Sequence, residues 1–198
     1  MKKNLLFLTV AAILSVATIV QSEAQIVTGG LRLGFNASKV VGDFGANYNF
    51  VPGIHVGPYV RVAPREKYRI EADVLFSTKG ASSDPTGSDR QYAIPFYLDI
   101  PVLFNYKPIA GLYFEAGVQP SFALTQMNFS QNSSNTTFDK TGLKTVDFAP
   151  VVGLGYEFKK ASLGLRGAFG VTNINDFSGY NPNQKNMTLM ATFGFKIF

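Results

Sequence analysis

The sequence predicts an all-β protein, an eight-stranded antiparallel up-and-down transmembrane β-barrel with short periplasmic turns and long external loops. Three observations predict this fold. Apolar and polar residues alternate with a period of two in eight stretches, long and short connections alternate between those stretches, and aromatic residues gather at the ends of the apolar faces. A period of two is typical of β-strands.

The first four predicted strands cover residues 31–38, 54–62, 70–77 and 94–106. In the first, Leu31, Leu33 and Phe35 alternate with Arg32 and Asn36. The other three have the same pattern, with mainly Val, Ile, Leu or Phe at every second position of one face. Each strand is therefore expected to have one apolar and one mainly polar face.

The last four predicted strands cover residues 112–124, 152–158, 163–171 and 189–197. The stretch LYFEAGVQPSFAL at 112–124 has Leu, Phe, Ala and Val on one face, and Glu115 and Gln119 among small residues on the other. No convincing amphipathic helix interrupts the series. Three prolines fall inside predicted strands and should mark bulges or rim positions, because proline lacks the N–H of a ladder bond: Pro58, Pro101 and Pro120.

The connections between the predicted strands differ in length in a regular way. The long segments KVVGDFGANYNFV, GASSDPTGSDRQY, NFSQNSSNTTFDKTGLKT and TNINDFSGYNPNQK alternate with the short segments PREK, PIAG and KK. Bacterial outer-membrane barrels have short periplasmic turns and long external loops. An even number of strands then leaves both chain ends on the short-turn side.

The aromatic residues of the apolar face form two bands. Tyr106, Phe114, Tyr156 and Phe195 lie near the short turns, and a second set lies toward the long loops: Phe35, Phe76, Phe96, Phe122 and Phe169. Such bands match the aromatic girdles of outer-membrane barrels. The apolar face is therefore expected to contact lipid and the other face to line a polar interior. The alternative is a soluble secreted barrel of lipocalin type, in which the two faces are inverted.

The first 24 residues have the features of a secretory signal peptide. Lys2 and Lys3 precede a mostly apolar run, and Ser22-Glu23-Ala24 is a small-x-small cleavage site. Residues 1–24 are thus predicted to be removed, leaving a barrel domain at 25–198. The formal charge changes from +5 to +4 on this cleavage, and no basic run indicates binding to nucleic acid. The chain has no Cys, which excludes disulfides and thiolate metal sites.

Charged residues on the predicted inner face are the main candidate site. Two interpretations stay open: a polar path for ions, or an ion-pair network that fills an interior just wide enough for side chains. Across the short PREK turn, pairing of apolar with apolar residues sets Arg61 opposite Glu71, close enough for an Arg–carboxylate pair. The candidate residues are Arg32, Arg61, Glu71, Asp73, Asp99, Glu115, Glu157, Arg166 and Lys196.

Catalytic, metal and cofactor sites are not expected. His55 is the only histidine, and its neighbours on the inner face, Tyr59 and Arg61, are neither a catalytic triad nor a set of metal ligands. An outer-membrane enzyme would need Ser, His and an acid at the outer rim. One predicted loop holds Ser and Asp without a histidine: Ser130, Ser133, Ser134 and Asp139.

Six segments resemble the PorT-like family of small outer-membrane β-barrels: GLRLGFNAS, EADVLFSTKGA, LDIPVLFNYKP, GLYFEAGVQPSFAL, VVGLGYEF and ATFGFKIF. The resemblance covers nearly the whole predicted mature chain and implies an outer-membrane barrel of OmpA type. Its motifs are structural and do not imply an activity. The founding member is associated with a secretion apparatus, and that role does not transfer on these motifs.

We therefore expect a monomeric outer-membrane barrel with a structural or binding role through its external loops. A narrow porin-like pore and an accessory barrel of a secretion apparatus are the alternatives. The expected partners are outer-membrane lipid and the insertion machinery, which reads the C-terminal strand. These insertion signals usually end in an aromatic residue on the lipid face, yet Phe198 is out of phase with Ile197 and Phe195. Either the last residue frays or a bulge shifts the register.

Overall fold

The computed structural model describes residues 26–43, 48–83, 91–130, 136–139, 143–174 and 183–198. The predicted signal peptide lies outside the described residues. The described chain consists of β-strands and connections, and it contains no helix long and apolar enough to cross a membrane. The strands are β1 (Ile26–Gly42), β2 (Tyr48–Arg65), β3 (Tyr68–Asp73), β4 (Leu75–Thr78), β5 (Ala81–Ser83), β6 (Gln91–Asp99), β7 (Val102–Tyr106), β8 (Leu112–Ser130), β9 (Thr136–Asp139), β10 (Val146–Glu157), β11 (Ala161–Phe169) and β12 (Gln184–Lys196).

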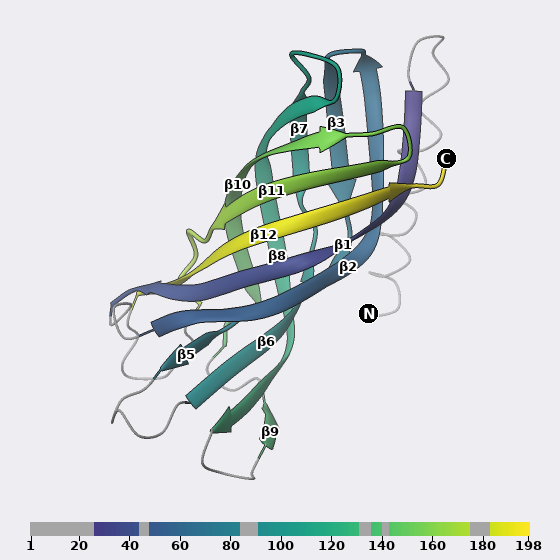
Figure 1. The fold of residues 1–198 in the computed structure, drawn as a ribbon. Helices are drawn as coiled ribbons and strands as arrows, with labels where there is room; N and C mark the ends of the chain where they lie inside the picture. Colours follow the sequence, from purple (N-terminus) through teal and green to yellow (C-terminus); the bar gives the residue numbers. More distant parts are fainter. Residues whose placement is uncertain (1–25, 44–47, 84–90, 131–135, 140–142, 175–182) are drawn as a thin grey trace, which may run out of the picture.

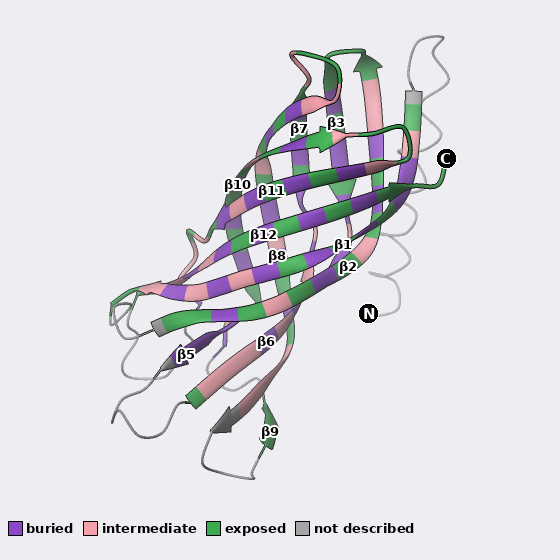
Figure 2. Ribbon diagram, viewed as in Figure 1, coloured by how far each residue is buried: buried purple, intermediate pink, exposed green. Residues whose placement is uncertain are grey.

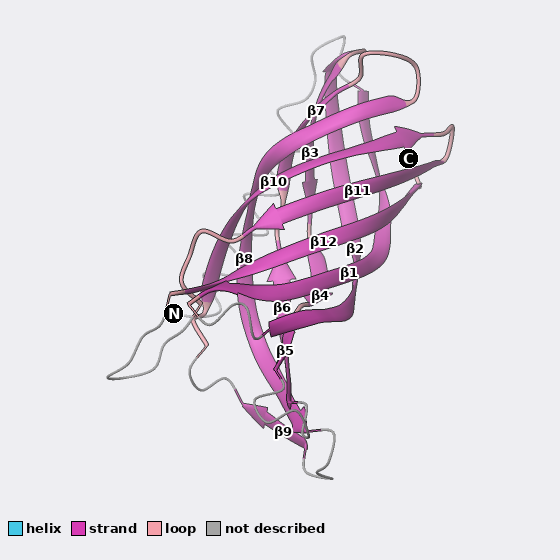
Figure 3. Cartoon of the chain, turned by 60° about the vertical axis from the view of Figure 1, so that its left-hand side comes forward, coloured by secondary structure: helices cyan, strands magenta, loops and turns pink. Residues whose placement is uncertain are grey.

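These strands form one closed antiparallel barrel (Figures 1 and 3). Its wall has eight long strands, some of which are divided into shorter segments. The segments β3, β4 and β5 together make the third long strand of the wall, and β6 and β7 make the fourth. β1 pairs with β2 on one side and with β12 on the other, which closes the ring. β9 forms a hairpin with the end of β8 at the long-loop end. Closure leaves the barrel wall without a free edge, as a sheet in hydrocarbon requires.

The two faces of each strand follow the predicted alternation (Figure 2). Along β1, Leu31, Leu33 and Phe35 are exposed on the outer face, whereas Arg32 and Asn36 are buried inside. The same alternation holds along the other long strands. Most residues of the two predicted aromatic bands are exposed on this outer face: Phe35, Phe76, Tyr106, Phe114, Phe122, Tyr156, Phe169 and Phe195. The prediction of an apolar outer face and a buried inner face is therefore confirmed.

One predicted long loop is short. β1 continues to Gly42 and β2 begins at Tyr48, so the connection 43–47 is no longer than the turn 107–111. The expectation that long and short connections alternate without exception was wrong at this position. The reason is that the alternating pattern of the wall continues through residues 39–42 and joins β12 as far as Gln184.

The third and fourth long strands of the wall are interrupted next to prolines. Val74 N donates to Pro58 O, and Asp73 N donates to Pro101 O at the gap between β6 and β7. Ile100 N similarly donates to Pro120 O. Because a proline returns no N–H to its neighbour, each pair loses one ladder bond and the strand assignment breaks. The three prolines thus mark ladder breaks within the wall, rather than the rim.

At the C-terminus, the two residues Ile197 and Phe198 lie opposite the single residue Gly29 of β1. The amides of Ile197 and Phe198 both donate to Gly29 O, and Gly29 N donates to Phe198 O. The extra residue shifts the alternation of inward and outward side chains by one position. The Phe198 ring consequently covers the position where a side chain on Gly29 would lie, on the outward side shared with Leu31. Of the two arrangements considered for Phe198, the structure has the shifted register.

Candidate functional site

The charged residues of the inner face converge in the half of the barrel nearest the short turns. The β2–β3 hairpin brings the first two together, with Arg61 directly opposite Glu71 and Val62 opposite Ile70. Arg61 donates from Nε and Nη2 to Glu71 Oε2 at 2.8 and 2.6 Å. The predicted register of this hairpin is confirmed. A tight turn and the alternation of faces were enough to define it.

Arg166 on β11 is the centre of the network. Its Nε donates to Glu115 Oε1 at 2.6 Å, its Nη1 to Asp73 Oδ2 at 2.7 Å and its Nη2 to Glu71 Oε1 at 2.7 Å. One guanidinium therefore binds three carboxylates, two from β3 and one from β8. All four side chains are at most 1% exposed. Charge-assisted bonds of this kind are needed to offset the cost of removing charges from water.

Arg32 on β1 adds a second cation to the same carboxylates. Its Nη2 lies 2.8 Å from Glu71 Oε1, and its Nε lies 3.4 Å from Asp73 Oδ2. These are ion pairs by distance, although the N–H groups do not have hydrogen-bond geometry toward the carboxylates. The guanidinium also lies over the Tyr59 ring, 4.9 Å from its centroid. Charge and an aromatic face together hold this cation in the interior.

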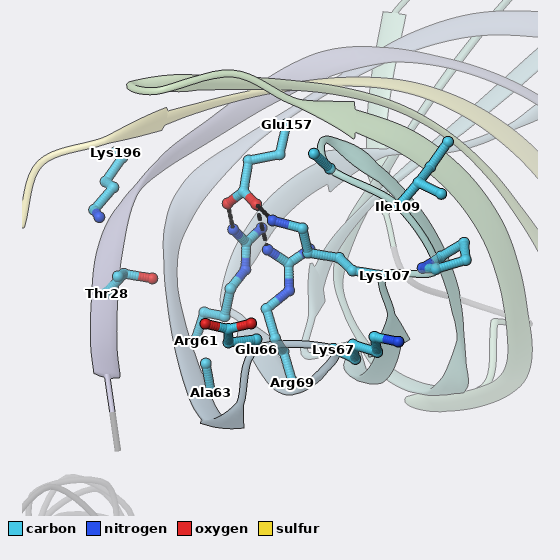
Figure 4. A pocket seen from close by; sticks show the side chains of 12 residues that line it. Thr28, Arg61, Ala63, Glu66, Lys67, Arg69, Lys107, Ile109, Glu157 and Lys196 are labelled. Carbon is cyan, nitrogen blue, oxygen red and sulfur yellow. Dashed lines mark hydrogen bonds and ion pairs between the residues drawn. The ribbon is translucent and has the colours of Figure 1, made fainter. Parts of the chain in front are cut away.

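Glu157 forms a second cluster nearer the turns (Figure 4). Its Oε1 accepts a 2.6 Å bond from Arg61 Nη1, and its Oε2 accepts bonds from Arg69 Nη1 at 2.6 Å and Lys107 Nζ at 2.8 Å. The sequence prediction did not include Arg69 or Lys107. Arg69 has the parity of Glu71 and lies one residue before the predicted strand, so extending the alternation by that residue would have identified it. Lys107 directly follows the predicted strand 94–106 and has the parity of Asn105, so the same one-residue extension would have identified it as well.

Two predicted members lie outside this network. Asp99 pairs with Lys79, whose Nζ lies 2.8 Å from Asp99 Oδ1 and 2.9 Å from Ser121 Oγ. Lys79 was also not predicted, because the expected strand ended at Ser77. Lys196 is exposed at the short-turn rim and forms no ion pair within the described part of the chain. Including Lys196 in the interior network was wrong, since β12 ends there and its last inward position opens to solvent.

His55 has a polar environment on the inner face. It is buried, and its Nδ1 lies 2.7 Å from Asn36 Oδ1, while the Asn36 amide donates to Ser77 Oγ at 3.2 Å. Across the residues that the structure describes, no group of three His, Cys, Asp or Glu side chains is placed to hold a metal ion. Ser133 and Ser134 of the loop considered for catalysis lie outside those residues.

Apolar residues fill the inner face between and beyond the charges. One buried cluster adjoins the network and contains Leu103, Ala149, Val151, Ala168 and Met190. A second lies at the long-loop end, where Leu143 and Ile174 fold in from the connections: Val40, Ala81, Tyr97, Ala123, Leu143 and Ile174. We call this second group the loop-end cluster. The interior is therefore layered, rather than polar throughout as expected.

Comparisons with known proteins agree with this architecture. A family model described as the outer membrane protein beta-barrel domain matches residues 21–176, more than half of the chain. The comparison with curated proteins gave no match.

Several solved structures of low sequence identity are similar to this chain. The attachment invasion locus protein Ail of Yersinia pestis, in complex with the heparin analogue sucrose octasulfate, is 12% identical with a TM-score of 0.49, over 86% of this chain and 99% of that one. Neisserial surface protein A is 12% identical with a TM-score of 0.49, over 88% and 100%. The outer membrane protein OprG from Pseudomonas aeruginosa is 15% identical with a TM-score of 0.44, over 87% and 95%.

Proposed function

This chain belongs to the outer membrane protein β-barrel domain family, and we propose that it is a closed, non-catalytic barrel whose role is structural or binding through its external loops. The outer membrane is its location. Cleavage after Ala24, a monomeric state and insertion guided by the C-terminal strand are parts of the same proposal. The finer PorT-like assignment rests on the sequence segments alone.

The filled interior is the observation that supports a closed barrel. An ion path needs charged groups that face water along the lumen. Here Arg166 and the three carboxylates that it binds are almost completely removed from solvent. An eight-stranded barrel has an interior that side chains fill. The ion-pair interpretation is therefore favoured over the ion path.

The loop-end cluster is a second closure in series with the first. Tyr97 is fully buried, and Leu143 and Ile174 are both at most 8% exposed. The backbone holds these two connections together, since Lys144 N donates to Ile174 O. If the ion-pair network alone were the plug, removal of one of its residues would raise the conductance. With two closures in series, one opening leaves the other in place.

Planar-bilayer conductance of the refolded protein tests this proposal. The wild type should show no steady single-channel current. The charge-neutral double variant Arg166→Ala/Glu115→Ala and the single variant Tyr97→Ala should each stay closed, and their combination should conduct. An outer-face variant, Leu165→Ala, serves as the control for altered folding. Steady current through the wild type would contradict this proposal and favour the alternative of a narrow pore.

An accessory role in a secretion apparatus is the remaining alternative. It is supported by the resemblance of segments such as LDIPVLFNYKP to PorT-like barrels. Gentle solubilisation followed by affinity purification distinguishes it from a self-contained barrel. A stoichiometric partner from the cell envelope would favour the accessory role, and a barrel that purifies alone would favour the proposal above.

A further inference from the structure

The short-turn end of the barrel contains an open cavity of about 480 Å³, which we call the vestibule (Figure 4). In outer-membrane barrels this end faces the periplasm. The walls come from the start of β1, the β2–β3 turn, the β7–β8 turn and the ends of β10 and β12. Its charged lining residues are Arg61, Lys67, Arg69, Lys107, Lys196, Glu66 and Glu157.

The vestibule has an excess of positive charge. Five of its lining residues are cations and two are carboxylates. Glu157 is already shared by Arg61, Arg69 and Lys107. Within the described residues, neither Lys67 nor Lys196 forms an ion pair. Cations that line a concave surface raise the local concentration of anions, because the low-dielectric walls focus the field.

Arg69 is the buried charge that this wall leaves incompletely paired. Its side chain is 5% exposed, and its one ion pair in the described structure is with Glu157. Its Nε and Nη2 have no hydrogen-bond partner among the described residues. The face of Tyr113, with a ring centroid 5.3 Å from Cζ, is its other contact. A buried cation that shares one carboxylate with two other cations is stabilised by any further negative charge nearby.

We propose that the vestibule binds a phosphate group, with Arg69, Lys67 and Lys107 supplying the positive charge. A phosphate group carries one or two negative charges and accepts hydrogen bonds on two or three free oxygens, which suits a wall of several separate donors. The group belongs either to a soluble phosphate ester of the periplasm or to a phospholipid headgroup. This site lies at the opposite end from the external loops, so its failure would leave the proposed loop role intact.

Calorimetric titration of the refolded full barrel with pyrophosphate tests the site, in zwitterionic detergent at constant ionic strength. The wild type should bind saturably. The double variant Lys67→Gln/Lys107→Gln should lose at least about tenfold in affinity. The matched control Lys159→Gln/Lys160→Gln removes the same charge from the neighbouring turn at the same rim, outside the vestibule, and should change affinity by less than about twofold.

Two results would overturn the site: no saturable binding to the wild type, or equal losses in the two double variants. The single variant Lys67→Gln removes a residue without an ion pair in the described structure, so its fold is secure, and it should weaken binding in the same direction. Nanodiscs then separate the sources. If the advantage of the wild type over Lys67→Gln/Lys107→Gln, present in phosphate-free detergent, disappears in both phosphatidylglycerol and phosphatidylcholine discs, the headgroup is the natural ligand. If it persists in both, the ligand is a soluble ester.

Discussion

At the scale of single residues, Glu71 is the carboxylate that pairs with three buried arginines. It lies within 2.8 Å of guanidinium nitrogens from Arg32, Arg61 and Arg166. Removing it leaves three buried cations short of a counter-charge, whereas removing Arg61 leaves Glu71 with two other partners. The structure therefore predicts unequal effects for two residues that the sequence treated as one pair.

We expect Glu71→Ala to lower the free energy of unfolding by about 3–5 kcal/mol, because it breaks a buried ion cluster. Arg61→Ala should cost less. The double variant should lose less than the sum of the two, since each single change strands a charge that the other removes. Urea unfolding of the refolded barrel in detergent micelles measures all three. Strict additivity would mean that the pair does not stabilise the barrel as a unit.

Gly155 lies on the inner face, where the glycines of the strands are expected to allow tight packing. From the sequence, a serine there is expected to cost less than an arginine at Leu154 or Leu165 on the outer face. In the structure, a Cβ on Gly155 would overlap Leu163 O and the end of the Tyr113 ring. Leu163 O belongs to the neighbouring strand and cannot move without disturbing the wall.

Gly155→Ser should therefore destabilise the barrel by about 1–3 kcal/mol, the usual cost of overpacking. Ser162→Ala is the control, because it lies on the same inner face and keeps its Cβ, and its cost should be below about 1 kcal/mol. The same urea unfolding measurement applies. Equal stability of Gly155→Ser and the wild type would show that Tyr113 and the strand backbone can relax around the added atoms.

At the scale of elements, each strand separates lipid from interior, and β11 shows this most simply. Leu165 is 61% exposed on the outer face and Arg166, the next residue, is 3% exposed on the inner face. Leu165→Arg should cost about 2–4 kcal/mol if the side chain lies near the bilayer midplane. Leu165→Met keeps the volume and polarity and should cost less than about 1.5 kcal/mol. Refolding yield and urea unfolding in lipid vesicles measure both, and equal tolerance would mean that the two faces are inverted.

At the scale of the whole molecule, a closed barrel has a recognisable behaviour in the cell and on gels. A ring without free edges resists detergent at room temperature, so the unheated protein should migrate differently from the boiled one. It should also fractionate with the outer membrane. Mass spectrometry of that fraction should find an N-terminus at Gln25. Recovery in the soluble periplasm would support the lipocalin-like alternative instead.

The sequence by itself determined the local features: the number of long strands in the wall, which face of each strand points outward, and the Arg61–Glu71 pair. A two-residue period and a tight hairpin turn define these over a few neighbouring residues. The limits of that approach are seen just outside the predicted strands. Arg69 and Lys107 lie one residue and Lys79 two residues beyond the predicted ends, and all three were missed because the barrel wall continues past the most apolar stretch.

Only the tertiary structure decided which side chains meet across the lumen. Arg166 is separated from Asp73 and Glu71 by more than ninety residues, and Lys79 takes Asp99 away from the central network. These contacts depend on the tilt and stagger with which eight strands close into a ring. No local pattern contains that information, because stagger is set by the pairing of β1 with β12, the first and last strands. The interior charges were visible in the sequence, but their partners were a consequence of closure.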